Sequence, residues 1–155
     1  MSDNRLYWED LNEGDESISG GRTITETDVV NFAGLSGDFN SFHIDEEAAK
    51  ASFFGKRVAH GMLIASVTTG LQVGQMEPKA RTAAFLGLAE WQFRGAVFFG
   101  DTIRVKRTIG PKKEWKDPKQ GFVEYHIEVL NQDDKVVQKG VWNMLIFRRD
   151  EGEAS

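Results

Sequence analysis

The chain contains no cysteine, which excludes disulfide bonds, thiolate metal sites and a cysteine nucleophile. It also lacks a long apolar run, since the longest falls far short of the ~18 residues that a membrane-spanning helix requires. No apolar segment follows the first residues, Met-Ser-Asp-Asn-Arg, so we expect no secretory signal. These absences predict a cytoplasmic protein without a membrane partner.

Positive charge is in deficit as well. Nineteen lysines and arginines stand against 24 acidic residues, for a net charge of −5. This balance argues against a nucleic-acid partner, which would need a segregated basic face. Lysines do cluster between residues 112 and 119, but acidic residues and prolines are interleaved with them. We therefore predict a long solvated loop from Gly110 to Gly121.

The length of 155 residues and the hydrophobic fraction of 40% predict a single domain, residues 1–155, with a core of its own. Residues 148–155 form a charged tail that we expect to fray. An extended segment with Tyr7 and Trp8 is expected to pack aromatic side chains onto the body of the domain.

Helix signals dominate the first half. Thr25 or Thr27 can cap a helix that Ser36-Gly37 ends, and Asp45 can cap a short helix after it. Residues 58–71 are apolar nearly all round, which is typical of a helix buried on most sides.

Strand signals dominate the second half. Alternating or β-rich segments lie at Arg81–Gly95, Thr102–Ile109, Phe122–Leu130 and Lys135–Phe147. One buried helix followed by four long antiparallel strands predicts an α+β domain whose sheet wraps a central helix.

An acid and an imidazole, Asp38 and His43, lie five residues apart in a Gly/Asn/Ser-rich break between apolar segments. Acid–base chemistry needs such a pair, because one group takes a proton while another delivers one. Gly61 opens the next apolar run and can offer a bare backbone N–H to a developing negative charge. Taken singly, however, Asp38 is typical of an Asx turn and His43 of a surface or core histidine.

The run from Phe32 to Asp45 contains Ser-Gly-Asp-Phe-Asn-Ser-Phe-His and closely resembles the signature of the MaoC-like, (R)-specific enoyl-CoA hydratase family. The block Val58-Ala59-His60-Gly61-Met62 resembles a second signature of that family. One departure is plain, because Ser41 stands where the family pattern has proline, whose ring would restrain the loop.

The resemblance implies a hot-dog fold, in which a curved antiparallel sheet wraps a long central helix, assembled as a homodimer. It implies that Asp38 and His43 form a catalytic dyad, with no metal and no cofactor, and that the Gly61 N–H polarises a thioester carbonyl. Which of the two dyad residues begins as the base stays open. The further residues that we expect at the substrate are Asn40, which would order the loop, His60, which would orient the start of the helix, Met62, and Thr69 near the dyad.

The leading hypothesis is therefore a hydratase or dehydratase that interconverts trans-2-enoyl and (3R)-3-hydroxyacyl thioesters of CoA or acyl carrier protein. A hot-dog acyl-CoA thioesterase is an alternative by fold analogy alone. A non-catalytic acyl-thioester-binding module is another, supported by the departure at Ser41. Lys56 and Arg57 are candidates for CoA phosphates, although solvated surface cations are the commoner case.

Overall fold

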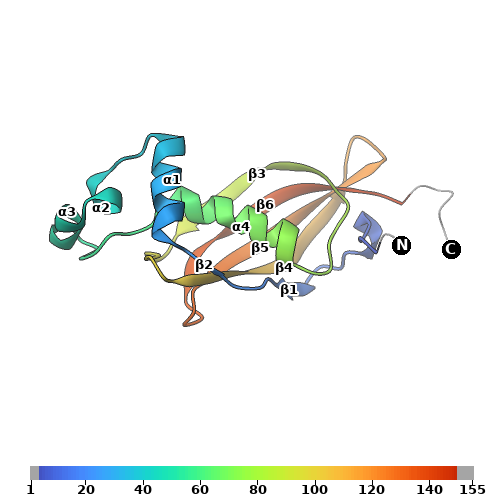
Figure 1. The fold of residues 1–155 in the computed structure, drawn as a ribbon. Helices are drawn as coiled ribbons and strands as arrows, with labels where there is room; N and C mark the ends of the chain where they lie inside the picture. The colour runs from blue at the N-terminus through green and yellow to red at the C-terminus, as the bar shows by residue number, and fades with distance from the viewer. Residues whose placement is uncertain (1–3, 150–155) are drawn as a thin grey trace.

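The computed structural model describes residues 4–149, and its long helix α4 lies along one face of a curved antiparallel sheet (Figure 1). The sheet has six strands in the order β1-β4-β5-β6-β3, and β2 also pairs with β4. The predicted α+β architecture with a helix against a wrapping sheet is confirmed. The elements are a 3-10 turn at Trp8–Asp10, β1 (Glu16–Ile18), β2 (Arg22–Thr23), α1 (Glu26–Ser36), α2 (Ser41–Ile44), α3 (Glu46–Ala51), α4 (Gly61–Gln75), β3 (Thr82–Phe93), β4 (Thr102–Glu114), β5 (Gln120–Leu130) and β6 (Val136–Phe147).

Hydrogen bonds at the helix ends set where α1 begins and ends and where α3 begins. Thr25, rather than Thr27, caps α1 through a reciprocal capping box with Asp28. Gly37 ends the helix in the left-handed region at φ 76°, which glycine adopts without steric cost. The Asp45 carboxylate accepts hydrogen bonds from the first N–H groups of α3. The predicted caps are thus confirmed.

Helix α4 is buried by the inward-facing residues of the long strands. Leu63, Ile64, Val67 and Leu71 on the helix belong to one core cluster with alternate residues of β4, β5 and β6. The β-branched pair Thr68-Thr69 does not break the helix, because the Thr68 hydroxyl donates to the Ile64 carbonyl at 2.8 Å and so is satisfied inside the core. The helix begins at Gly61, three residues after the start of the predicted apolar segment.

The predicted loop from Gly110 to Gly121 is wrong over much of its length. Strand β4 continues through Pro111 to Glu114, with a register shift between Ile109 and Lys112 in its pairing with β5. Such an irregularity accommodates a residue without an N–H, which is where proline is tolerated in a sheet.

Ion pairs join residues near the start of the described chain to residues at its end. Arg148 donates to Glu9 at 2.9 Å and Arg149 to Asp10 at 2.6 Å, so the predicted fraying is wrong for these two arginines; the rest of the expected tail lies outside the described residues. The Trp8 indole donates to the Phe122 carbonyl at 2.9 Å, which confirms the packing of the aromatic lead-in. No helix among residues 4–149 is long and apolar enough to cross a membrane.

Candidate active site

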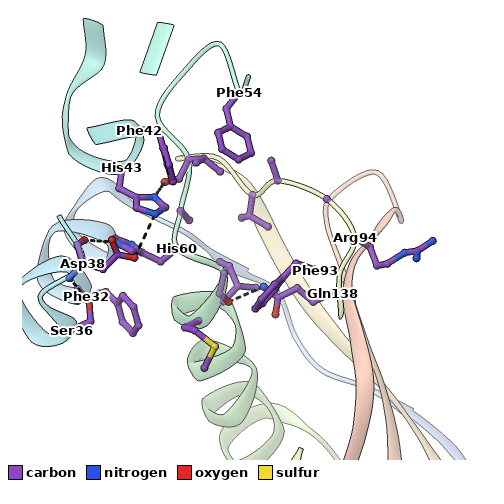
Figure 2. A pocket seen from close by; sticks show the side chains of 18 of the residues that line it. Phe32, Ser36, Asp38, Phe42, His43, Phe54, His60, Phe93, Arg94 and Gln138 are labelled. Atoms are coloured by element: carbon purple, nitrogen blue, oxygen red, sulfur yellow. Dashed lines mark hydrogen bonds and ion pairs between the residues drawn. The ribbon is translucent and has the colours of Figure 1, made fainter. Parts of the chain in front are cut away.

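A cavity of about 770 Å³ opens at the N-terminal end of α4, where the chain from α1 to α2 meets the turn after β3 (Figure 2). Its walls are mostly apolar, and a few polar groups face the space, a combination typical of small-molecule sites. The lining side chains on which the argument depends are Phe32, Asp38, Phe42, His43, Phe54, His60, Met62, Phe93, Arg94 and Gln138.

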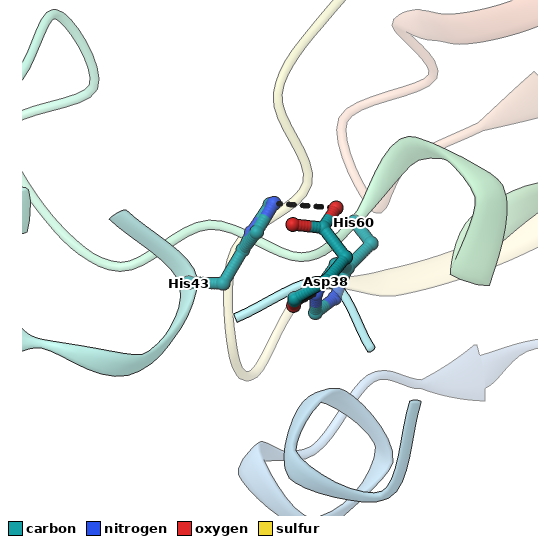
Figure 3. Close-up of side chains that lie close together, drawn as sticks. All are labelled: Asp38, His43 and His60. Carbon is teal, nitrogen blue, oxygen red and sulfur yellow. Dashed lines mark hydrogen bonds and ion pairs between the residues drawn. The ribbon is translucent and has the colours of Figure 1, made fainter. Parts of the chain in front are cut away.

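Asp38 and His43 meet at one side of this cavity. Their facing atoms, Asp38 Oδ2 and His43 Nε2, are 3.9 Å apart (Figure 3). This separation is too long for a direct hydrogen bond, but one water molecule can contact both atoms. The Asp38 side chain is 52% exposed, whereas that of His43 is 7% exposed. The predicted proximity of the two side chains is confirmed, and their catalytic roles stay a prediction.

A backbone hydrogen bond sets the tautomer of His43. Its Nδ1 lies 2.6 Å from the Val58 carbonyl oxygen, and because a carbonyl only accepts, Nδ1 must carry the proton. The neutral ring therefore presents a lone pair on Nε2, toward Asp38. Burial lowers the pKa of His43 from its ordinary value of 6.5, and nearby His60 lowers it further, against opposing contributions from Val58 and Asp38. His43 is thus held as a neutral base at neutral pH.

His60 and Arg57 hold the two dyad residues in position through contacts with their rings and backbone. The His60 ring stacks on that of His43 with centroids 3.7 Å apart, and its Nε2 donates to the Asp38 carbonyl oxygen at 2.9 Å. His60 is also the residue that precedes the first turn of α4, so it ties the helix start to the Asp38 loop. Arg57 donates to the His43 carbonyl at 2.9 Å and pairs with Glu26, so its guanidinium supports the dyad instead of standing free for a phosphate.

Gly61 is the first residue of the 15-residue helix α4, whose positive dipole end therefore faces the cavity. Within residues 4–149 its N–H has no hydrogen-bond partner, as is usual in the first turn of a helix. Its carbonyl accepts from Gln138 Nε2 at 2.8 Å, and Gln138 in turn accepts from the Trp91 indole at 3.1 Å. A Cβ at this position would lie 2.9 Å from the Phe93 ring, so only glycine fits without a shift.

The other expected substrate residues fall into two groups. His60 and Met62 line the cavity. Asn40 does not line it but orders the loop through its backbone, since its N–H donates to Asp38 Oδ1 at 3.2 Å and its carbonyl accepts from the His43 N–H at 2.9 Å. Thr69 lies eight residues beyond Gly61, about 12 Å along the helix axis, and lines a different cavity. Within the one described chain, Thr69 therefore does not border the cavity of the dyad, and its role near the dyad stays a prediction.

Several cavity residues escaped the sequence analysis. Phe32, Phe42 and Phe54 reach the cavity from three separate segments, and no local pattern predicts that convergence. The sequence does contain one sign of Gln138, because it is a polar residue at a position of β6 where the alternation favours an apolar one. In the structure this side chain is 2% exposed. Phe93 also lines the cavity, whereas the nearby aromatic residues Trp91, Phe98 and Phe99 do not.

Asp38, His43 and His60 each offer a potential metal-ligand atom, and these atoms lie within 4.8 Å of one another. The two rings are nearly parallel, with an interplanar angle of 23°. Because a nitrogen lone pair lies in the plane of its ring, stacked rings direct their lone pairs side by side and not toward one point. This arrangement fits a proton-transfer dyad better than an ion held by both rings.

We expect the acid limb of kcat/KM to lie below pH 6.5. Since burial and His60 lower the pKa of His43, its active neutral form persists to lower pH than that of a free imidazole and is lost only as the pH falls through the depressed value. The pH dependence of kcat/KM, with a proton NMR titration of the His43 ring, checks this. An acid midpoint above 6.5 would contradict the assignment of His43 as the neutral base.

Fold comparison gives the class of the protein first. A Mycobacterium tuberculosis protein with a double hot-dog fold superimposes with a TM-score of 0.82 over 98% of this chain and 47% of its own, at 16% identity. The hot-dog fold expected from the resemblance is thus shown. A MaoC-like dehydratase structure from Rhodospirillum rubrum superimposes with a TM-score of 0.85 at 32% identity, covering 94% of this chain and 99% of that one.

Sequence comparison then gives the family. Residues 13–130 match the family model of the MaoC like domain, and the chain belongs to this family. It is 42% identical to Protein MaoC of Klebsiella aerogenes over 70% of this chain but 32% of that protein. It is 37% identical to an (R)-specific enoyl-CoA hydratase of Rhodospirillum rubrum over 66% of this chain and 69% of that protein. The chain thus spans about a third of the Klebsiella relative and about two thirds of the Rhodospirillum one.

Proposed function

We propose that this chain catalyses the reversible hydration of trans-2-enoyl thioesters to (3R)-3-hydroxyacyl thioesters. The observation that carries the proposal is the pairing of Asp38 with a neutral His43, 3.9 Å apart, in the same cavity as Gly61, whose N–H has no partner in the described part of the chain. Relatives named as (R)-specific enoyl-CoA hydratase and 3-hydroxybutyryl-CoA dehydratase support it.

The reaction places a water molecule between Asp38 and His43. As the water oxygen bonds to C3, the O–H bond breaks and its proton passes to His43 Nε2, while the π electrons of the C2=C3 double bond move toward the thioester carbonyl and form an enolate. The Gly61 N–H and the α4 dipole stabilise that negative charge. The proton then returns from the dyad to C2, so no proton is gained or lost. The Asp38 carboxylate holds the water and offsets the charge of the imidazolium.

We propose CoA as the thiol carrier, because four of the relatives that match are named for CoA thioesters. One relative, from Arabidopsis thaliana, is named a 3-hydroxyacyl-[acyl-carrier-protein] dehydratase, so carrier-protein thioesters belong in the substrate panel. Arg94, exposed at the rim of the cavity and directed away from it (Figure 2), is a more accessible cation for a phosphate than Arg57.

The direct test follows the ultraviolet absorbance of the conjugated enoyl thioester when the protein is added to crotonyl-CoA, with chiral analysis of the product. We expect loss of absorbance and a (3R)-hydroxyacyl product. Free thiol without hydration would point to a thioesterase. Binding without turnover across longer, branched and carrier-linked substrates would point to a binding module.

We further propose that the chain forms a homodimer through the free edge of β3. Among residues 4–149 this strand ends the sheet and pairs only with β6, and its apolar side chains Phe85, Leu86 and Leu88 are 47%, 45% and 42% exposed. An unpaired apolar edge favours pairing with a second strand. We expect Leu88→Lys to reduce the molar mass measured by light scattering from that of a dimer to that of a monomer. Ile18→Lys on the opposite edge, where Ile18 is 51% exposed, should leave the mass unchanged, and equal effects of the two substitutions would contradict this interface.

We also propose that the protein is located in the cytoplasm, which cell fractionation would test.

A further inference from the structure

A second cavity of about 310 Å³ lies between the C-terminal half of α4 and the inner face of the sheet. It shares no lining residue with the cavity of the dyad. Its lining residues come from the N-terminal segment, the end of α4, the turn before β3 and four strands: Arg5, Thr69, Gln72, Val73, Lys79, Ala80, Thr82, Phe85, Arg107, Tyr125, Trp142 and Met144. Three of these residues are cationic and none is acidic.

Arg107 is the unusual member of this set. It occupies an inward position of β4, alternating with the core residues Val105 and Ile109, and it is 5% exposed. Its Nη2 donates to the Ser17 hydroxyl at 3.3 Å and to the Pro78 carbonyl at 3.1 Å. Within residues 4–149, Nε has no acceptor and no carboxylate pairs with the guanidinium. Although burial lowers the pKa of Arg107, a guanidinium starts so high that it stays charged at neutral pH. The cavity therefore holds a buried positive charge without a counter-charge, which a folded protein rarely retains.

Three more hydrogen-bonding atoms on this cavity are buried without a partner in the described chain. They are Gln72 Nε2, Tyr125 Oη and Trp142 Nε1, on side chains that are 8%, 3% and 4% exposed. The indole and the amide nitrogen can only donate. Burial raises the pKa of Tyr125, so its phenol also keeps a proton to donate. Within residues 4–149, three unpartnered donor groups thus lie beside one cation that itself has an unpartnered N–H, and this set complements an anion.

We propose that this cavity binds a small organic carboxylate, whose two oxygens take the donors of Arg107, Tyr125 and Trp142. The fork of a guanidinium matches the two oxygens of a carboxylate. Beside the cations Arg5 and Lys79, the side chains of Val73, Phe85 and Met144 give the cavity an apolar wall, so the ligand carries a short hydrocarbon body. The volume is near the lower limit for small-molecule pockets, which suits an anion about the size of hexanoate.

Calorimetric titration with hexanoate tests the site without requiring any turnover. We expect saturable binding at one site per chain, and at least a tenfold weaker affinity for hexanamide, which has the same size without the charge. Arg107→Met should weaken hexanoate binding at least tenfold, and Tyr125→Phe about threefold or more. Asp38→Asn should leave hexanoate binding unchanged, because the dyad lies in the other cavity.

No saturable binding, equal affinity for hexanamide, tighter binding of inorganic phosphate, or full affinity in Arg107→Met would each overturn the proposal. If Arg107→Met fails to fold, as judged by near-ultraviolet circular dichroism, the proposal is tested by two other results. These are the affinity for hexanoate compared with that for hexanamide, and the affinity of Tyr125→Phe for hexanoate.

The same carboxylate could be free in solution or terminate the acyl chain of a substrate, and this second source depends on the proposed hydratase function. A kinetic arm compares methyl-ended with carboxylate-ended enoyl thioesters. If Arg107→Met lowers kcat/KM at least tenfold for the carboxylate-ended substrate alone, the acyl chain is the source. If the thioesters are unaffected while hexanoate binding is lost, the ligand is free.

Discussion

Asp38→Asn is expected to lower kcat for the hydration of crotonyl-CoA about 1000-fold, within the range that acid–base groups contribute. The amide oxygen can still accept the hydrogen bond that the Asn40 N–H gives to Asp38 Oδ1, and His60 bonds only to the backbone of this residue. The loop should therefore keep its form while the charge that holds the water and offsets the imidazolium is lost. Steady-state kinetics with crotonyl-CoA measures the effect.

A matched pair of controls separates this effect from unfolding. Asp133→Asn, in the β5–β6 turn, removes an exposed carboxylate that does not line the cavity and should leave kcat unchanged. His126→Gln removes the exposed histidine of β5, which lies beside Glu124, and should do the same, whereas His43→Gln should lose about as much as Asp38→Asn. Because the two dyad residues act on one water molecule, the double variant should lose little more than either single one. Additive losses, or near-normal turnover by Asp38→Asn with an unchanged melting temperature, would exclude the dyad.

The features predicted correctly from the sequence are those that depend on neighbouring residues. The Thr25 cap, the glycine at position 37 and the Asp45 cap each satisfy backbone groups within three or four residues, so the local pattern is enough. The family signature adds the Asp38–His43 pair, whose geometry is also local, because one turn of α2 joins the loop to His43.

Ser41 illustrates how local geometry also absorbs a departure from the family pattern. It is the first residue of α2, where proline is favoured because the missing N–H would have no partner in the helix. A serine there loses the ring's restraint on φ but no hydrogen bond. The loop still places Asp38 and His43 on the same space, so the substitution gives little support to a binding module without catalysis.

Predictions failed where long-range packing decides. Gly110-Pro111 has the composition of a turn, yet β4 passes through it because a register shift against β5 absorbs the proline. The close approach of His126, whose Nε2 would lie 2.7 Å from a Cβ at Gly110, is likewise a contact between strands. Gln138 and Arg107 are buried polar residues in alternating strands, and only the facing elements show that each borders a separate cavity.

Gly61→Ala is expected to lower kcat about 100-fold. The new methyl group would lie 2.9 Å from Cε1 and 3.0 Å from Cδ1 of Phe93, closer than carbon atoms pack. Either the start of α4 or the Phe93 ring must then move. A shift of the helix start displaces the N–H that faces the thioester oxygen, and the loss of one such donor costs 100-fold or more, while a shift of the ring disturbs the wall that positions the acyl group.

The rest of the same helix supplies the control. Gly70 is also in α4, but a Cβ there meets nothing within 4 Å, so Gly70→Ala should retain full activity and stabilise the helix by up to about 1 kcal/mol. Gly61→Ala combined with Phe93→Ala removes the clash and should recover at least tenfold of the lost kcat. Recovery with a KM still raised would assign the helix N–H to transition-state stabilisation and Phe93 to binding of the acyl group. A normal kcat in Gly61→Ala would contradict the expected loss, because it would mean that the Phe93 ring alone moves and that this wall does not position the acyl group for the reaction.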